Sequence, residues 1–317
     1  MTIRTYALTS RVQKKLTYMV EDLDAHPTTE EVAFTQLSEL VEQLPSELMS
    51  FLLSFRESRN ADAIVIEGLP LGATGDTPTP RDPINASRDV LGLQALSLAI
   101  LGVIATPFAY VTQQEGRLVN NIAPSPDAVE RANIGIGSHE PFDLHTEDAF
   151  MENPPSYLML TCIRNPTQTG TSIAGLNVRL EDEVSSLLRD ECFIVGTNPA
   201  QSSWQDVKPG PVLYGALDRP FLRYNSINTI VAAGATHAHE KALEVLKTAL
   251  QRSLTTLDNK PGDLLIVNNY HVCHARNAFE AKFDGSDRWL QRVVGYRDPR
   301  VVAELTQFRG YPMLLPR

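Results

Sequence analysis

The sequence has few cysteines and no long run of basic residues, and each absence excludes a class of protein. Its 317 residues include only 3 Cys, far apart and without a CxxC pair, which excludes a small disulfide scaffold and fits a reducing compartment. Lys and Arg number 28 against 38 Asp and Glu, so the formal net charge is −10. Phosphate backbones and anionic lipids repel such a chain. We therefore expect a cytoplasmic protein that binds neither nucleic acid nor membranes.

Long hydrophobic runs are also scarce. The stretch from Val90 to Gln114 carries no charge and is long enough to span a bilayer. Polar side chains punctuate it, Pro107 breaks it and basic flanks are lacking, so we predict a buried helix followed by a strand. The segment from Met1 to Ser10 lacks the apolar core of a signal peptide.

The order of elements predicts an α+β fold. Apolar residues recur at helical spacing through the first sixty residues, and a strand candidate over 63–68 is followed by a loop over 70–87. The rest consists mainly of short β-rich runs, with one amphipathic helix around residues 243–254. Neither GxGxxG nor GxxxxGK[ST] occurs. We expect a double-stranded β-helix (jelly roll) core with N-terminal and inserted helices. It would form one domain over 1–317, with residues 1–60 as a helical layer and 61–317 as the core.

One of the seven histidines begins the pattern His-x-[Asp or Glu], namely His145-Thr146-Glu147. Alone this pattern is weak, because it arises by chance in a chain of this composition. Residues i and i+2 of an extended strand share a face, so both side chains can address one ion. Far downstream, a buried strand over 264–267 leads to His271 and His274, and Arg288 follows 14 residues after His274. Two histidines and a carboxylate form the facial triad of non-haem Fe(II) oxygenases, and an arginine fork suits a dicarboxylate.

Three blocks carry a resemblance to a known family: 144–150 (LHTEDAF) followed by two prolines, 211–215 (PVLYG), and 262–292, which ends in FDGSDRWLQR. In this order the sequence resembles the clavaminate synthase-like Fe(II)/2-oxoglutarate-dependent oxygenases. This group includes asparagine and arginine β-hydroxylases of antibiotic pathways, and the taurine dioxygenases are more distant relatives. A Glu in the carboxylate ligand position is characteristic of the group.

The resemblance implies specific roles. The metal ligands would be His145, Glu147 and His274, and the cofactors would be Fe(II), 2-oxoglutarate and O2. Arg288 would bind the distal carboxylate of 2-oxoglutarate with a hydroxyl of Thr171, or of Ser172 if the match shifts by one residue. His271 competes with His274 as ligand, and the spacing to Arg288 favours His274. The candidate substrate-binding residues are His139, Arg223, Asn225 and Asn228.

Two other features have simpler interpretations. His237 and His239 would share one face of a strand as a rival metal pair, but Glu240 and Lys241 start a helix directly after them, which favours a helix N-terminus. Cys273 precedes His274, and strand alternation turns its thiol to the opposite side.

The substrate class follows from the resemblance and from one absence. Relatives mostly oxidise the β-carbon of an amino acid, and those that take arginine hold it with acidic side chains near the segment equivalent to 221–228. Here that segment contains no carboxylate, and a buried cation without a counter-charge is costly. We therefore predict hydroxylation of an amino acid, or of an intermediate derived from one, with a neutral or polar side chain. Carrier-bound substrates, desaturation, cyclisation, a zinc hydrolase and a non-catalytic small-molecule-binding protein remain as alternatives.

Overall fold

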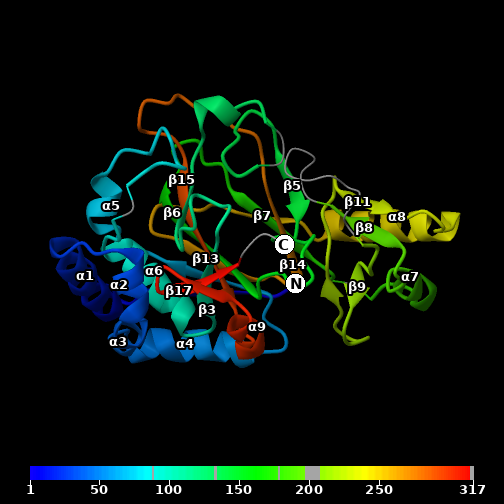
Figure 1. Cartoon of the computed structure of the whole chain (residues 1–317), viewed down its shortest axis with the longest axis horizontal. Coiled ribbons are helices and arrows are strands. Elements are labelled where there is room, and N and C mark those ends of the chain that lie inside the picture. Colours follow the sequence, from blue (N-terminus) through cyan, green and yellow to red (C-terminus); the bar gives the residue numbers. More distant parts are fainter. Residues whose placement is uncertain (88, 132–133, 178, 197–207, 315–317) are drawn as a thin grey trace.

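Two β-sheets lie face to face, and helices cover their outer sides (Figure 1). The computed structural model describes residues 1–317 except 88, 132–133, 178, 197–207 and 315–317. Helices α1 to α6 lie on the outer side of the larger sheet, whereas α7 and α8 lie beyond the smaller one. The chain is thus a mixed α and β fold in four layers.

The larger sheet has nine strands in the order β1-β2-β13-β6-β15-β3-β17-β16, with β4 paired to β15. Its strands are β1 (Ile3–Ala7), β2 (Ala63–Glu67), β3 (Thr106–Tyr110), β4 (Asn120–Ile122), β6 (Tyr157–Arg164), β13 (Leu264–Asn268), β15 (Trp289–Tyr296), β16 (Thr306–Phe308) and β17 (Tyr311–Leu314). Most neighbours in this sheet are distant in the sequence, so long-range pairing sets the strand order.

The smaller sheet carries the site and has the order β12-β7-β14-β5. Its strands are β5 (Phe142–His145), β7 (Thr171–Gly175), β12 (Thr255–Leu257) and β14 (Val272–Arg276). Two antiparallel pairs accompany it: β8 (Phe193–Val195) with β11 (Thr229–Val231), and β9 (Leu213–Tyr214) with β10 (Phe221–Leu222).

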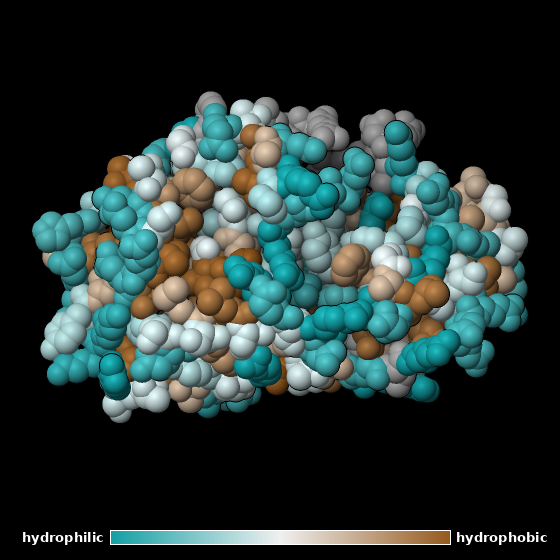
Figure 2. Space-filling view, turned by 90° about the horizontal axis from the view of Figure 1, so that it is seen from below, coloured by the Kyte–Doolittle hydropathy of each residue, from teal (hydrophilic) through white to brown (hydrophobic). Residues whose placement is uncertain are grey.

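The helices follow the expected apolar periodicity. They are α1 (Ser10–Ala25), α2 (Glu30–Thr35), α3 (Leu37–Glu42), α4 (Ser46–Glu57), α5 (Gly72–Asp76), α6 (Gly92–Gly102), α7 (Asp182–Leu187), α8 (His237–Arg252) and α9 (Pro299–Ala303). The uncharged stretch forms the buried helix α6 followed by β3, which confirms that prediction. In the described part of the chain, no helix combines the length and apolarity needed to cross a membrane. On the face in Figure 2, apolar side chains gather toward the N-terminal helices, and hydrophilic side chains surround them.

Alternation along the strands divides the core into layers. In β13, Leu264 and Ile266 pack with the helical layer, whereas Leu265 and Val267 pack between the sheets. In β14, Val272 faces the space between the sheets, and Cys273 faces the cluster that contains α8 residues. His274 therefore points between the sheets, because side chains two residues apart share a face. The predicted opposite orientation of Cys273 is confirmed.

Two expectations about the N-terminal third are wrong in part. Residues Ile3–Ala7 form strand β1 rather than helix, because they pair in parallel with β2, some sixty residues onward. The segment over 70–87 is not a loop throughout, since it contains the short helix α5. Strand β1 and helix α5 both make contacts with segments far away in the sequence, which local patterns do not reveal.

Candidate metal centre

Three side chains that suit metal binding meet between the sheets. One ligand atom from each of His145, Glu147 and His274 lies within 4.8 Å of the others, and all three residues are buried. Nε2 of His274 lies 3.2 Å from Oε2 of Glu147, and Nε2 of His145 lies 4.0 Å from the same oxygen. The two histidines are direct partners across β5 and β14. Two imidazoles and one carboxylate are the donor set of non-haem Fe(II) oxygenases.

The charge states of these groups also fit a divalent cation. Nδ1 of His145 lies 2.7 Å from the carbonyl oxygen of Asp143 and donates to it, which leaves the Nε2 lone pair for a metal. Burial, assisted by His274, lowers the pKa of His145 to about 3, so its imidazole is neutral. Burial alone would raise the pKa of Glu147, but Arg292 and the imidazoles hold it well below its usual range.

Glu147 does not lie on a strand, contrary to the expectation of one extended segment. Strand β5 ends at His145, and Glu147 begins a turn in which Asp148 has a positive φ of 49°. The amide of Glu147 donates to Oδ1 of Asn269 at 2.6 Å, and its carbonyl accepts from Nδ2 of Asn269 at 3.0 Å. A side chain from elsewhere in the chain therefore holds this peptide.

Sequence reasoning missed the polar side chains around Glu147. Arg292 on β15 donates to Oε1 of Glu147 and to Oε1 of Gln113, and it donates to Oδ1 of Asn120 at 2.5 Å. Its Nε is buried and, among the described residues, has no acceptor. Burial and Glu147 raise the pKa of Asp148 to about 7. Arg292 lies four residues after Arg288 within the third block of the family resemblance. This position was the one feature of the sequence that could have identified Arg292 as part of the site.

Arg288 is buried and forms no ion pair with the described residues. Its side chain is 3% exposed, and Nε donates to the carbonyl oxygen of Thr169 at 3.1 Å. No carboxylate of the described chain lies within ion-pair distance of it; Asp284 and Asp287 instead accept from neighbouring residues. Burial lowers the pKa of Arg288 to about 10, and the nearby Arg276 contributes.

Arg276 is a second buried arginine in the same region. It lies two residues after His274 on the same sheet face, and its Nη atoms donate to the carbonyl oxygens of Gly137 and Glu140 at 3.0 and 3.1 Å. The Phe279 ring centroid lies 5.1 Å from Cζ of Arg276 and 6.0 Å from Cζ of Arg288. Two buried cations around one ring, neither paired with a described carboxylate, suit a doubly charged anion.

The two candidate hydroxyls lie on opposite faces of β7. Thr171 pairs with Arg276 across β14, so its side chain points between the sheets, and its Oγ1 accepts from Nδ2 of Asn259 at 2.5 Å. Ser172 is turned away and shares a 2.9 Å hydrogen bond with Thr256. The face of the sheet that carries His274 therefore includes Thr171 and not Ser172.

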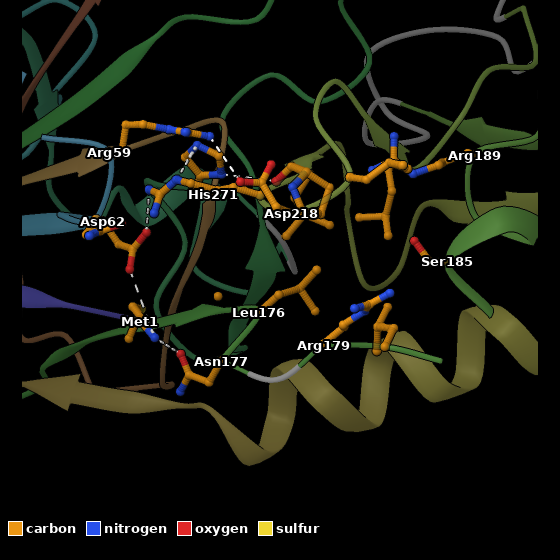
Figure 3. A pocket seen from close by; sticks show the side chains of 18 of the residues that line it. Met1, Arg59, Asp62, Leu176, Asn177, Arg179, Ser185, Arg189, Asp218 and His271 are labelled. Carbon is orange, nitrogen blue, oxygen red and sulfur yellow. Dashed lines mark hydrogen bonds and ion pairs between the residues drawn. The ribbon is translucent and has the colours of Figure 1, made fainter. Parts of the chain in front are cut away.

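His271 lies outside the cluster, in a cavity of about 1190 Å³ that none of the three ligands lines (Figure 3). Its Nδ1 donates to the carbonyl oxygen of Pro220 at 3.0 Å, and its Nε2 accepts from Nε of Arg219 at 3.2 Å. Burial and Arg219 lower its pKa to about 4. The structure brings His274 to the cluster and leaves His271 as a structural residue of this cavity.

The four candidate substrate residues lie in different settings. Asn225 forms an isolated antiparallel β-bridge with His145. The backbone amide of the buried Asn228 donates to Oδ1 of Asn225 at 2.9 Å. Arg223 donates to the carbonyl oxygen of Ala149 at 2.6 Å. His139 is 40% exposed at its side chain and contacts Glu130 at 2.8 Å. Among these, Asn225 lies directly opposite the candidate ligand His145 across this bridge.

The rival histidine pair forms a helix start, as predicted. Helix α8 begins at His237, whose Nδ1 lies 2.8 Å from Glu240. His239 caps the helix through Thr236 and lies 3.0 Å from Asp190. Each imidazole thus contacts a carboxylate at the start of this helix or next to it.

A fold of two facing sheets with a buried His-Glu-His cluster, near a buried arginine that pairs with no carboxylate of the described residues, is typical of a non-haem iron oxygenase. Residues 211–294 match the family model described as taurine catabolism dioxygenase TauD, TfdA family. The chain is 30% identical to enduracididine beta-hydroxylase of Streptomyces hygroscopicus over 288 residues, which cover 82% of this chain and 84% of that one. It is 32% identical to L-asparagine oxygenase of Streptomyces coelicolor, covering 84% and 81% of the two chains.

Solved structures agree with the sequence relatives. The non-haem iron oxygenase OrfP, in complex with Fe and alpha-ketoglutaric acid, superposes with a TM-score of 0.90 at 26% identity, covering 98% of this chain and 99% of that one. An asparagine oxygenase in complex with Fe(II), 3-hydroxyasparagine and succinate gives a TM-score of 0.88 at 28% identity, with 99% of both chains covered. The chain belongs to the TauD/TfdA family and is an Fe(II)/2-oxoglutarate-dependent dioxygenase.

Proposed function

We propose that this enzyme hydroxylates the β-carbon of a free amino acid, or of an intermediate derived from one, whose side chain is neutral or polar. The observation that carries the proposal is the buried His-Glu-His cluster beside two buried arginines that pair with no carboxylate of the described residues. The relatives named above as amino-acid hydroxylases support the substrate class. We also infer that the facing sheets are the two halves of a double-stranded β-helix in a single domain.

The metal and cosubstrate would be held by separate groups. His145, Glu147 and His274 would bind Fe(II), which with 2-oxoglutarate and O2 supplies the oxidising power for hydroxylation. Arg288 would pair with the distal carboxylate of 2-oxoglutarate, and the hydroxyl of Thr171 would donate to the same carboxylate. The apolar residues between the sheets would keep bulk water from the reacting carbon.

The polar groups around Glu147 suit the zwitterionic end of an amino acid. Arg292 is a half-buried cation that would orient the α-carboxylate, and its buried Nε has no acceptor among the described residues. The carboxylates of Glu147 and Asp148 and the amide oxygen of Gln113 are acceptors for an ammonium group. Opposite charges a few ångströms apart in a buried site orient a zwitterion in one direction.

Asn225 would contact the side chain of the substrate. Its Oδ1 already accepts the amides of Ile227 and Asn228 at 3.1 and 2.9 Å. The carboxamide therefore has only its Nδ2 donor left for a ligand, and a donor favours an oxygen acceptor over a guanidinium or ammonium group. His139, Arg223 and Asn228 remain predicted contacts of lower rank because their observed partners are structural.

A panel of free amino acids tests the proposal, with succinate formation and product mass as readouts. Neutral or polar substrates should stimulate 2-oxoglutarate turnover and gain one oxygen atom, whereas arginine and lysine should not. Loss of two hydrogen atoms instead would identify desaturation or cyclisation. Efficient turnover of arginine would refute the predicted selectivity.

The variant Asn225→Asp sharpens this test. It keeps the acceptor for both turn amides and replaces only the Nδ2 donor with a carboxylate oxygen. Activity should shift toward cationic amino acids by about tenfold or more, the effect of one charge-assisted hydrogen bond. A ratio of turnover of cationic to neutral amino acids that is the same in Asn225→Asp and in wild type would contradict the role of Asn225.

A further inference from the structure

Glu147 is the metal ligand that the sheet itself does not hold. His145 and His274 lie on paired strands, whose ladder fixes both backbones. Glu147 lies beyond the end of β5, in a turn that continues into the left-handed residue Asp148. Its position must therefore be set by other contacts.

Asn269 supplies these contacts through one carboxamide. Its Oδ1 accepts the Glu147 amide at 2.6 Å, while its Nδ2 donates to the carbonyl oxygens of Glu147 and Pro155 at 3.0 and 2.9 Å. The side chain is 1% exposed, and the amide of Asn269 donates to the carbonyl oxygen of Ser156 at 3.0 Å. The backbone N–H and the backbone carbonyl of Glu147 are thus both hydrogen-bonded to the side chain of Asn269.

Asn269 lies in the short connection between the two sheets. It follows β13 of the larger sheet and precedes β14 of the smaller one, where His274 lies. The short connection between the two sheets therefore clamps the backbone of Glu147 just before the chain enters the strand that carries His274.

We propose that Asn269 is a positioning residue of the metal centre: by clamping the Glu147 peptide, it aligns this carboxylate with the two imidazoles and raises affinity for the metal. Arg292 holds the outer oxygen of the same carboxylate, so Glu147 is restrained at both ends and presents Oε2 to the imidazoles. Only an amide side chain supplies both the acceptor and the donors at this length. The inference rests on the metal site and not on the identity of the amino-acid substrate.

Metal affinity is the direct test. Metal-free wild-type protein and the Asn269→Ala and Asn269→Ser variants would be titrated with Mn(II) by isothermal calorimetry, without cosubstrate or substrate. Groups that orient metal ligands typically change affinity by about 10- to 100-fold, so we expect both variants to bind Mn(II) weaker by that factor. Two substitutions guard against a failure of either one to fold, which circular dichroism would detect.

Two matched controls separate alignment from general destabilisation. Asn268→Ala removes the neighbouring carboxamide, whose oxygen accepts the Tyr270 amide at 3.2 Å and no other group of the described residues. Ile266→Val weakens the core under the same strand without touching Glu147. Both should bind Mn(II) within about twofold of wild type, on the same scale of positioning effects. Mn(II) binding by the Asn269 variants as tight as by these controls would overturn the proposal, even if the substrate panel confirmed amino-acid hydroxylation.

Discussion

Replacement of Arg288 by Met should change stability and cosubstrate binding in opposite directions. The side chain is 3% exposed and has no described carboxylate partner. Burial and Arg276 bring its pKa down to about 10, which corresponds to roughly 3 kcal/mol against the charged form in the ligand-free protein. Met removes this charge and fills a similar volume.

The size of each effect follows from the contacts. Loss of the hydrogen bond to Thr169 costs about 1 kcal/mol, so the ligand-free Arg288→Met variant should be more stable than wild type by about 1 to 2 kcal/mol. The expected increase in Tm is a few degrees, because about 2 to 4 °C corresponds to 1 kcal/mol in chains somewhat shorter than this one. Loss of a bidentate charged pair should weaken 2-oxoglutarate binding by about 3 kcal/mol or more, roughly 100-fold.

Thermal unfolding and calorimetry of the Mn(II)-loaded protein, with and without 2-oxoglutarate, measure both effects. Saturating cosubstrate at about 100 times Kd should stabilise wild type by about 2.7 kcal/mol and leave Arg288→Met nearly unchanged. Arg288→Lys is the matched control, since it keeps the charge without the fork and should show weak binding and no gain in stability. A Met variant that is less stable without ligand, or that is still stabilised by 2-oxoglutarate, would refute the reasoning.

Three further predictions concern neighbouring groups. His145→Ala and His274→Ala should each abolish turnover and also Mn(II) binding measured by calorimetry. A variant that retains turnover and Mn(II) binding would show that the replaced histidine is not a metal ligand. Arg276→Gln should raise Kd for 2-oxoglutarate by about tenfold, because one positive charge near the cosubstrate is lost. The control Arg189→Gln should leave this Kd unchanged, because Arg189 donates to two backbone carbonyl oxygens away from the site. The half-buried His271 has a folded-state pKa of about 4, below its unfolded value, so its stabilising contribution is lost as pH falls from about 6.5 toward 4. His271→Gln should therefore flatten the fall in Tm over that range, and an unchanged slope would contradict this assignment.

Local sequence patterns predicted most elements of the fold but not their order. Helical periodicity indicated the N-terminal helices and the helix that became α8, and apolar runs located β2 and β13 with small shifts at their ends. Strand β1 was missed because its pairing partner β2 lies far along the chain. Hydrogen bonds between distant strands contribute nothing to local periodicity, so the order of the sheet could not be read from it.

The candidate ligands were likewise accessible from the sequence, since the resemblance to the oxygenase family pointed to His145, Glu147 and His274, which the structure brings together. The same resemblance predicted Arg288 as the arginine that binds the cosubstrate. Only the tertiary structure decided how these groups are held. It placed Glu147 in a turn rather than a strand, turned His271 into a separate cavity, and brought Asn269 and Arg292 to the two ends of the same ligand. Residue types reveal which donors a chain has, whereas the convergence of donors from remote segments depends on how the two sheets pack against each other.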